Sequence, residues 1–237
     1  MPVDIPDFQF RQATMYRPTR LVLKEGKVFW QDFFNECAEE IFSRGGTILD
    51  IGGGMRIDPK RCNRIDPVRQ QTFSHFLAEP TVSYIVSDYT AQYHPDIVED
   101  IHALSLKEGS VDSVICLAVL EHVYDPKKAV EEIVRVLKPG GLGLLYVPFM
   151  YRYHANLTQD YMDYYRYSKD GISYLFRGCQ ELSICPVRGL FESLARFTPI
   201  HQLAPLRWIL RRLDWSTERM RRISERQSSG YFIRIVR

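Results

Sequence analysis

Short apolar segments alternate with stretches of helical character along the middle of the chain, and this alternation constrains the fold more than any other feature. The segments are Thr47–Ile51, Val82–Ser87, Val111–Leu117 and Leu142–Val147. Between the last two, a helix is expected from Pro126 to Leu137, followed by a turn at Lys138–Gly141. Strands that are apolar along their whole length are buried on both faces, so the pattern predicts a parallel sheet covered by helices on either side.

The flanks of this core are expected to be irregular or helical. Apolar residues recur every four positions from Lys27 to Ser43, which predicts a helix with one apolar face. Residues 1–23 read as irregular, Gly189–Gln227 as largely helical, and Glu181–Val187 and Tyr231–Val236 as further strands. We therefore expect a single domain made of an N-terminal extension and helix (1–46), a core (47–187), a helical cap (188–228) and a final strand (229–237).

Composition excludes several classes of protein. The 237 residues, 45% of them apolar, suit one α/β domain, and a formal charge of +2 gives no reason to expect nucleic acid. The five cysteines are odd in number and none are closely spaced, which indicates free thiols in a reducing compartment. We expect a cytoplasmic protein, because there is neither a signal-peptide pattern nor a membrane-spanning run. The sequence contains no cluster of carboxylates that would indicate a metal site.

The strongest local signal is the run Ile48–Gly54, in which three glycines follow a buried strand. Glycines there allow a ligand to approach the backbone, and the carboxyl edge of a parallel sheet is where ligands bind. A tight strand-to-helix turn needs glycine for steric reasons as well, so both interpretations stay open. A dinucleotide fits poorly, because Ile57 replaces the third glycine and residues 68–72 contain no acid for the ribose.

Two acids further along suit the remaining parts of a nucleoside. Asp88, followed by Tyr89, ends the second strand, and an ionised carboxylate can accept hydrogen bonds from both ribose hydroxyls. Asp100 can accept from an adenine amino group while the next backbone N–H, that of Ile101, donates to the ring. Taken singly, each aspartate fits an ordinary turn or helix cap equally well.

The order of these segments resembles the class I S-adenosylmethionine-dependent methyltransferases of the type 11-like group. The resemblance covers about residues 46–150 and is most specific over Val111–Val123 and Val134–Gly141. It implies a Rossmann-like, seven-stranded and mostly parallel sheet flanked by helices, with an N-terminal helix and a C-terminal helical cap. It also implies S-adenosyl-L-methionine as the cofactor.

The same resemblance assigns roles to individual residues. The positions that it gives to the cofactor are Asp50, Gly52, Gly53, Gly54, Asp88, Tyr89, Asp100, Ile101, Leu117, Ala118 and His122. The glycine turn and Leu117–Ala118 would hold the methionine end, Asp88 the ribose and Asp100 the adenine, whereas His122 fits a buried, hydrogen-bonded role equally well. One departure is an added loop at Met55–Arg64, before a helix at Pro67–Ala78, which can shape a lid.

The acceptor site is expected after the fourth strand, where residues 148–168 are dense in aromatic and charged side chains. Such a wall suits a small molecule or a sugar, although tyrosines at this spacing also pack helices onto sheets. A hydroxyl acceptor needs a base, for which His154 is the first candidate and Asp163 the second, and a surface-loop histidine is the alternative for His154. Arg166 can pair with an anionic acceptor or fix Asp163. This run also resembles methyltransferases encoded with bacterial surface-polysaccharide genes.

The C-terminal region is basic, with nine arginines and three acids from Arg207 onward. An amphipathic helix in it can rest as a peripheral element on an anionic membrane, but the favoured interpretation is a cap helix that packs on its own domain. The predicted function is O-methylation of a small molecule or glycan, with C- or N-methylation still open. A non-catalytic scaffold subunit is the alternative, and a nicotinamide-dependent oxidoreductase is disfavoured.

Overall fold

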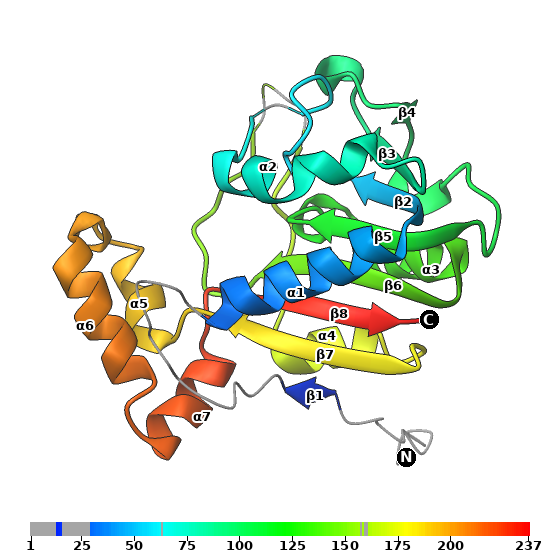
Figure 1. The fold of residues 1–237 in the computed structure, drawn as a ribbon. Coiled ribbons are helices and arrows are strands. Elements are labelled where there is room, and N and C mark those ends of the chain that lie inside the picture. Colours follow the sequence, from blue (N-terminus) through cyan, green and yellow to red (C-terminus); the bar gives the residue numbers. More distant parts are fainter. Residues whose placement is uncertain (1–12, 16–28, 63, 157, 159–160) are drawn as a thin grey trace, which may run out of the picture.

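A computed structural model describes residues 13–15, 29–62, 64–156, 158 and 161–237 (Figure 1). Its centre is an eight-stranded sheet in the order β1-β7-β8-β6-β5-β2-β3-β4. The strands are β1 (Thr14–Met15), β2 (Gly46–Ile51), β3 (Val82–Asp88), β4 (Ile97–Val98), β5 (Val111–Leu117), β6 (Leu137–Pro148), β7 (Glu181–Val187) and β8 (Gly230–Val236). Among these described strands, only β8 runs antiparallel to its neighbours, so the predicted, mostly parallel sheet is confirmed.

The predicted strands are all present, and β5 and β7 begin and end at the expected residues. The expected turn at Lys138–Gly141 instead lies inside β6, because Leu137 already pairs with Val111 before pairing resumes between Leu142 and Ser113. The four residues 138–141 therefore form an irregularity within the strand, at which Gly140 has a left-handed φ of 75°. The start of β6 was predicted five residues too late for this reason.

An eighth strand corrects the predicted count of seven. Strand β1 pairs in parallel with β7, with Thr14 opposite Ser183, in a region that was expected to be irregular. A two-residue strand is too short to show the alternation or apolar run by which strands are recognised. The rest of the predicted irregular segment 1–23, and the predicted helix start at Lys27, lie outside the described residues.

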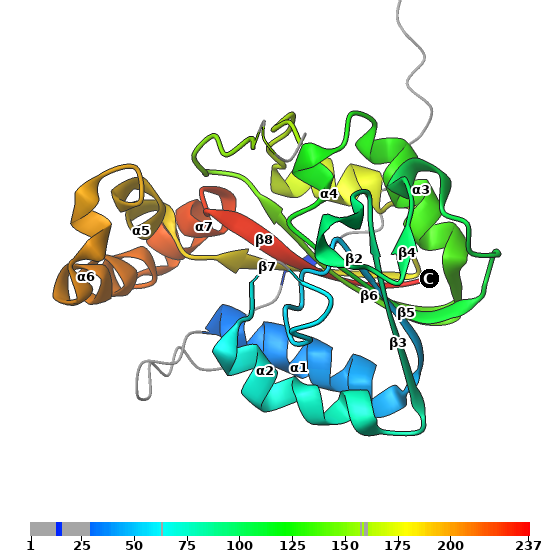
Figure 2. The same cartoon turned by 90° about the horizontal axis from the view of Figure 1, so that it is seen from above.

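Helices cover both faces of the sheet (Figure 2). One face carries α1 (Phe29–Arg44) and α2 (Pro67–Phe73), and the other carries α3 (Pro126–Val136) and α4 (Lys169–Leu175). The Asp66 side chain caps α2, which continues as a 3₁₀ helix (Ser74–Ala78). Phe42 of α1 and Phe73 of α2 stack on each other, with ring centroids 5.8 Å apart. The sheet is thus buried on both sides, as its apolar strands predicted.

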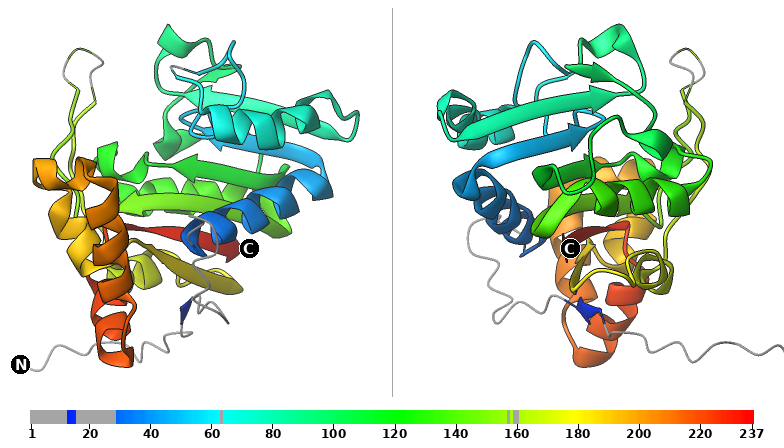
Figure 3. Two further views of the ribbon diagram at one scale, coloured as in Figure 1. Left: turned by 60° about the vertical axis from the view of Figure 1, so that its left-hand side comes forward. Right: turned by 90° about the vertical axis from the view of Figure 1, so that its right-hand side faces the viewer.

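The C-terminal cap consists of α5 (Leu190–Ala195), a 3₁₀ turn (Pro199–Gln202), α6 (Ala204–Asp214) and α7 (Glu218–Arg226). It lies between β7 and β8 in the chain, beyond the end at which β7 finishes (Figures 1 and 3). Strands β2, β5 and β6 end toward the same side (Figure 1). The cap therefore stands at the carboxyl edge of the parallel strands, where a ligand site is expected.

Hydrogen bonds to Asp214 and an ion pair of Arg211 attach α6 to the rest of the cap. Asp214, which is fully buried, accepts hydrogen bonds from the backbone N–H groups of Phe191 (2.7 Å) and Glu192 (3.0 Å) and from the Ser224 hydroxyl (3.1 Å). Arg211 pairs with Glu192 at 2.8 Å. Leu206 and Leu210 of α6 are half-buried, as expected for a cap helix that packs on its own domain, whereas Trp208, Ile209 and Leu213 are exposed.

We expect Asp214→Ala to lower the free energy of unfolding by about 2 to 4 kcal/mol, because two backbone N–H groups and a hydroxyl lose their buried acceptor. Urea denaturation followed by circular dichroism measures the change. Glu131→Ala, at an exposed acid on α3, is the matched control and should change stability by less than about 0.5 kcal/mol. Equal effects of the two substitutions would contradict the role given to Asp214.

Candidate functional site

The glycine turn after β2 is organised by a buried carboxylate. Asp50 Oδ1 accepts the Gly54 N–H at 3.0 Å, while Oδ2 accepts the Met55 N–H at 3.0 Å and the Tyr84 hydroxyl at 2.5 Å. Gly52 and Gly53 have φ values of 77° and 57°, which favour glycine. Asp50 therefore holds the turn itself, and a direct contact of its side chain with a cofactor stays a prediction.

The ionised form of Asp50 is costly in this position. Its side chain is fully buried, and desolvation raises the pKa of the carboxyl from 3.8 to about 6. The hydrogen bonds from Tyr84 and from the turn lower the pKa and only partly offset the desolvation. A near-neutral pKa at the base of a glycine turn is typical of sites whose geometry is set by function rather than by stability alone.

The turn lies directly against the end of β5. A Cβ built on Gly54 would lie 2.7 Å from the Leu117 Cβ, and one on Gly52 would lie 2.6 Å from the Val119 Cγ2. Between these two contacts, Ala118 has a left-handed φ of 59°, a strained conformation for a residue with a side chain. Glycine is thus required here for close packing, so the steric interpretation of the motif is correct and does not exclude a ligand.

A cavity of about 560 Å³ opens at this place. Its lining residues are Trp30, Gln31, Asp32, Phe34, Asn35, Gly54, Arg56, Asp66, Val68, Arg69, Leu117, Ala118, Tyr146, Val187, Arg188 and Phe232. Gly54, Leu117 and Ala118 are the predicted cofactor residues among them. The contribution of α1 and β8 to the wall was not predicted, because contacts between distant segments leave no local pattern in the sequence.

Arg69 is a wall residue that the sequence analysis missed. It donates to the Gly54 carbonyl at 2.9 Å, and its guanidinium lies 4.4 Å from the centroid of the Phe34 ring. In the sequence analysis, residues 68–72 were examined only for an acid that could bind the ribose of a dinucleotide, and they contain none. Arg69 therefore fixes the glycine turn from outside, as Asp50 does from beneath.

The added loop after the turn is anchored to β3. Arg61 donates to the Tyr84 carbonyl at 2.9 Å and pairs with Asp58 at 2.8 Å and Asp96 at 2.5 Å. Met55 and residue 57 at its start are buried, and residue 63 lies outside the described residues. A lid role for this loop stays a prediction, although these contacts favour a fixed wall.

The predicted ribose and adenine acids both cap their own turns. Asp88 is half-buried at the end of β3 and accepts the Thr90 N–H at 3.0 Å, and burial raises the pKa of its carboxyl. Asp100 Oδ1 accepts the backbone N–H of His102 at 2.9 Å and lies 2.6 Å from its Nδ1. The side chain of Asp100 remains 59% exposed, Ile101 is buried, and Tyr89 is exposed. None of these four lines the cavity described above.

The three predicted catalytic residues lie together on the loop after β6. The backbone N–H of His154 donates to Asp163 Oδ2 at 2.8 Å, and its Nδ1 lies 3.1 Å from the Arg152 carbonyl. Arg166 holds Asp163 through both guanidinium Nη atoms, one of them 2.6 Å from Oδ2, and donates to the Arg152 carbonyl at 2.9 Å. Arg166 therefore fixes Asp163, one of the two roles considered for it, and a catalytic role for the three residues stays a prediction.

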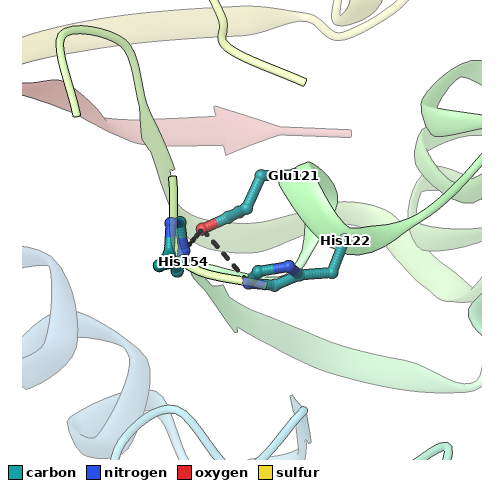
Figure 4. Close-up of side chains that lie close together, drawn as sticks. All are labelled: Glu121, His122 and His154. Carbon is teal, nitrogen blue, oxygen red and sulfur yellow. Dashed lines mark ion pairs between the residues drawn. The ribbon is translucent and has the colours of Figure 1, made fainter. Parts of the chain in front are cut away.

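A fourth member of this group, Glu121, was missed. It follows β5 and is 1% exposed, with Oε1 3.7 Å from His154 Nε2 and 3.9 Å from His122 Nε2 (Figure 4). Its backbone carbonyl accepts the N–H groups of Tyr164 and Tyr165, which brings the acceptor loop onto the end of β5. In the sequence, Leu120–His122 contributed only to the resemblance to methyltransferases. The local pattern of residues does not reveal that Glu121 is buried.

Charge within the group distinguishes the two candidate bases. Arg166 holds the pKa of Asp163 down to about 2, so this carboxylate is ionised and already occupied. Glu121 raises the pKa of His154 above its usual value, with a smaller effect from Asp163. The geometry therefore favours His154 as the residue at which a proton can be exchanged, with Asp163 and Arg166 positioning it.

Several known proteins that are similar to this chain are named as methyltransferases. A family profile described as "Methyltransferase domain" matches residues 66–145, a span that begins after the glycine turn. An uncharacterized methyltransferase of Mycobacterium sp. (strain JLS) is 26% identical over 148 residues, 60% of this chain and 54% of the relative. A ubiquinone biosynthesis O-methyltransferase of Xanthomonas oryzae pv. oryzae is 42% identical over 102 residues, 41% of each chain. This chain thus spans about half the length of these curated relatives, or less.

The fold has a counterpart among solved structures. A SAM-dependent methyltransferase from Archaeoglobus fulgidus superposes with a TM-score of 0.50 at 14% identity, covering 89% of this chain and 100% of that protein. At this identity the likeness concerns the fold alone. In the part of the chain that the structure describes, no helix is long and apolar enough to cross a membrane.

The raised pKa of Asp50 predicts a pH-dependent difference between the wild type and Asp50→Asn. The folded-state pKa, about 6, exceeds the unfolded value of 3.8, so the stabilisation from the protonated carboxyl is complete below pH 4 and disappears as the pH rises through 6. Relative to the variant, the wild type should lose up to about 3 kcal/mol of unfolding free energy across this window. Parallel stability curves from urea titrations at pH 4 to 7 would contradict the prediction.

Proposed function

We propose that this chain, whose residues 66–145 match a methyltransferase-domain profile, transfers a methyl group from S-adenosylmethionine to a hydroxyl of a small-molecule or glycan acceptor. The observation that supports this most directly is the cavity at the carboxyl edge of β2 and β5. There the glycine turn, the strained Ala118 and a mixed charged and aromatic wall meet at one place.

The cavity suits the chemistry of the cofactor. The methionine end of S-adenosylmethionine carries an ammonium and a carboxylate, and the wall offers Asp32 and Asp66 for the first and Arg56 for the second. The sulfonium is a cation, for which the ring faces of Trp30 and Tyr146 are attractive partners. The cofactor supplies an electrophilic methyl group, and the protein has to place an acceptor in line with it.

Methyl transfer to oxygen also requires the removal of a proton. As the acceptor oxygen bonds to the methyl carbon, the carbon–sulfur bond breaks, and the hydroxyl proton has to leave. In our proposal it leaves toward the group formed by Glu121, His122 and His154, which lies on the segment directly after Ala118 and on the facing loop. Asp163 and Arg166 keep His154 oriented through its backbone and its Nδ1 side.

The choice of a hydroxyl acceptor rests on the site and on relatives. The Xanthomonas relatives are named for O-methylation in ubiquinone biosynthesis, although their match covers less than half of either chain. The facing loop presents exposed tyrosine rings, including those of Tyr153 and Tyr164, and such faces suit an aromatic ring or a sugar. The rival proposal, a non-catalytic scaffold, accounts for the glycine turn through packing but not for a cavity with a mixed charged and aromatic wall.

Calorimetric titration with S-adenosylmethionine and S-adenosylhomocysteine tests the proposal. We expect micromolar binding to the wild type, weakened at least about tenfold by Asp88→Ala and by Asp100→Ala, because each removes a hydrogen-bond acceptor for the nucleoside. Asp170→Ala, at an exposed acid on α4, is the control and should bind as the wild type does. Binding would justify an acceptor screen with labelled cofactor, beginning with phenols and sugar derivatives. No binding to folded protein would favour the scaffold.

We further propose that the cap contacts an anionic membrane surface. Its exposed apolar side chains, each at least 46% exposed, are Leu194, Phe197, Ile200, Leu203, Trp208, Ile209 and Leu213. Arg207 and Arg212 are exposed on α6, and the guanidinium of Arg212 lies 4.1 Å from the Trp208 ring centroid. Apolar residues with flanking arginines suit the interface of an anionic bilayer.

Sedimentation with vesicles tests this contact. We expect binding to phosphatidylserine-containing vesicles that weakens with added salt, and that falls about tenfold or more in Arg207→Gln/Arg212→Gln, because each arginine near the surface contributes about 1 kcal/mol. Trp208→Ala/Ile209→Ala should also reduce binding, whereas Tyr174→Ala, at an exposed tyrosine on α4, should not. The absence of binding at low salt would overturn the proposal.

A further inference from the structure

We propose that Glu121, His122 and His154 bind a divalent transition-metal ion of the Zn²⁺ type at the carboxyl edge of β5. The three residues offer one carboxylate oxygen and two imidazole nitrogens, and these ligand atoms all lie within 4.8 Å of one another (Figure 4). This departs from the sequence-based expectation of no metal, which rested on the absence of clustered carboxylates. The cluster comes from two segments 32 residues apart, so no ligand spacing marks it in the sequence.

The spacing of the ligand atoms is close to that of a coordination sphere. Glu121 Oε1 lies 3.9 Å from His122 Nε2 and 3.7 Å from His154 Nε2. In a tetrahedral Zn²⁺ site with bonds of about 2.0 to 2.1 Å, neighbouring ligand atoms are about 3.3 to 3.4 Å apart. The ligand atoms of the two histidines also lie within 4.8 Å of each other, so side-chain movements of up to about 1.5 Å close the coordination sphere. The two imidazole rings lie edge to face, with centroids 4.9 Å apart, so their planes do not obstruct each other.

Both imidazoles are held with the correct nitrogen toward the cluster. His122 Nδ1 lies 2.6 Å from the Met162 carbonyl, and His154 Nδ1 lies 3.1 Å from the Arg152 carbonyl and 3.3 Å from Asp163 Oδ2. Because a carbonyl oxygen only accepts, the Met162 contact places the ring proton of His122 on Nδ1 and leaves its Nε2 lone pair facing Glu121. The Arg152 carbonyl favours the same tautomer for His154, although Arg166 Nη2 also lies 3.5 Å from its Nδ1. Outer hydrogen bonds of this kind fix the tautomer and orientation of metal-binding histidines.

Glu121 itself is the second, independent indication of a missing cation. Its side chain is 1% exposed, and among the described residues its buried Oε2 has no hydrogen-bond partner. A buried carboxylate with an unsatisfied oxygen is costly, and a bound cation removes most of that cost. The nearby guanidinium of Arg166 interacts with Glu121 through its charge, but its N–H groups donate to Asp163 and to backbone carbonyls.

The ligand types select the class of metal. Two imidazoles favour Zn²⁺, Co²⁺, Ni²⁺ or Fe²⁺, whereas Mg²⁺ and Ca²⁺ prefer sites made of oxygen atoms. Three protein ligands also leave a coordination position open, which is the arrangement of catalytic rather than structural zinc sites. The metal would therefore be able to accept a further ligand from solution.

This open position gives the site a role that rests on the proposed methyl transfer. Ala118, three residues before Glu121, lines the cavity together with Tyr146, so the metal site and the cavity adjoin the same end of β5. An acceptor hydroxyl bound to the metal would lose its proton more easily, because a metal ion stabilises the resulting oxyanion. His154 would then act as a ligand rather than as the base. The favoured acceptor would carry an oxygen able to bind a transition metal.

Metal titration of tag-free protein, first stripped with a chelator, tests the site directly. We expect one equivalent of Co²⁺ to produce visible d–d absorption and one equivalent of Zn²⁺ to displace it. Glu121→Gln, His122→Ala and His154→Ala should each weaken binding at least about tenfold. His75→Ala, at an exposed histidine outside the cluster, and Cys62→Ser, at the least buried cysteine, should leave the affinity unchanged.

The outcomes separate this proposal from the methyltransferase function. Circular dichroism establishes that each variant is folded, and His154→Gln serves as a milder change if His154→Ala is not. Stoichiometric Co²⁺ binding that depends on the three residues supports the site even if S-adenosylmethionine does not bind. The proposal is overturned if folded wild type binds no Co²⁺ or Zn²⁺, or if the three variants bind as tightly as the controls. In that case Glu121 and His154 act as a metal-free acid–base pair.

Discussion

The burial of the Asp50 carboxylate beneath the glycine turn is the interaction on which the ligand edge of this protein depends. It satisfies two N–H groups of the turn and the hydroxyl of Tyr84 on the neighbouring strand, so β2, β3 and the turn share one acceptor. The turn is thereby pressed against the end of β5, where only glycine fits beside Leu117 and Ala118 adopts a strained backbone. Burial of the carboxylate lowers the stability of the protein, and in return its hydrogen bonds fix the backbone of the glycine turn at one edge of the sheet.

At that edge, the cavity and the loop after β6 both adjoin the end of β5. Strand β5 ends at the cavity through Ala118 and, three residues later, supplies the buried Glu121 to the acceptor loop. The loop is bound in return by two backbone hydrogen bonds to the Glu121 carbonyl and by the pairing of Asp163 with Arg166. A shift of the β5 end would therefore move the cavity and the loop together, and in the methyl transfer that we propose this would couple the cofactor to the acceptor.

Much of the fold could be predicted because burial on both faces leaves a clear signal. Strand β5 is buried along almost its whole length and was located to the residue, whereas the two-residue edge strand β1 has no pattern to recognise. The same reasoning fails for the site. Glu121 and Arg69 are charged, so a hydrophobic pattern treats them as surface residues, and only the fold shows that one is buried and the other braces the glycine turn. His154 was predicted because its loop was unusually rich in aromatic and charged residues.

The cap shows a different limit of sequence analysis. The periodicity of α6 correctly predicted an amphipathic helix, but an apolar face indicates only that something covers it, not which surface does so. In the structure the helix is attached by the buried Asp214 and by Arg211, while its side chains Trp208, Ile209 and Leu213 remain exposed. The cap stands at the carboxyl edge of the sheet, the edge at which the residues of the glycine turn line the cavity (Figure 1). A membrane at this position would bring a lipid-linked acceptor to the same edge as the cofactor site.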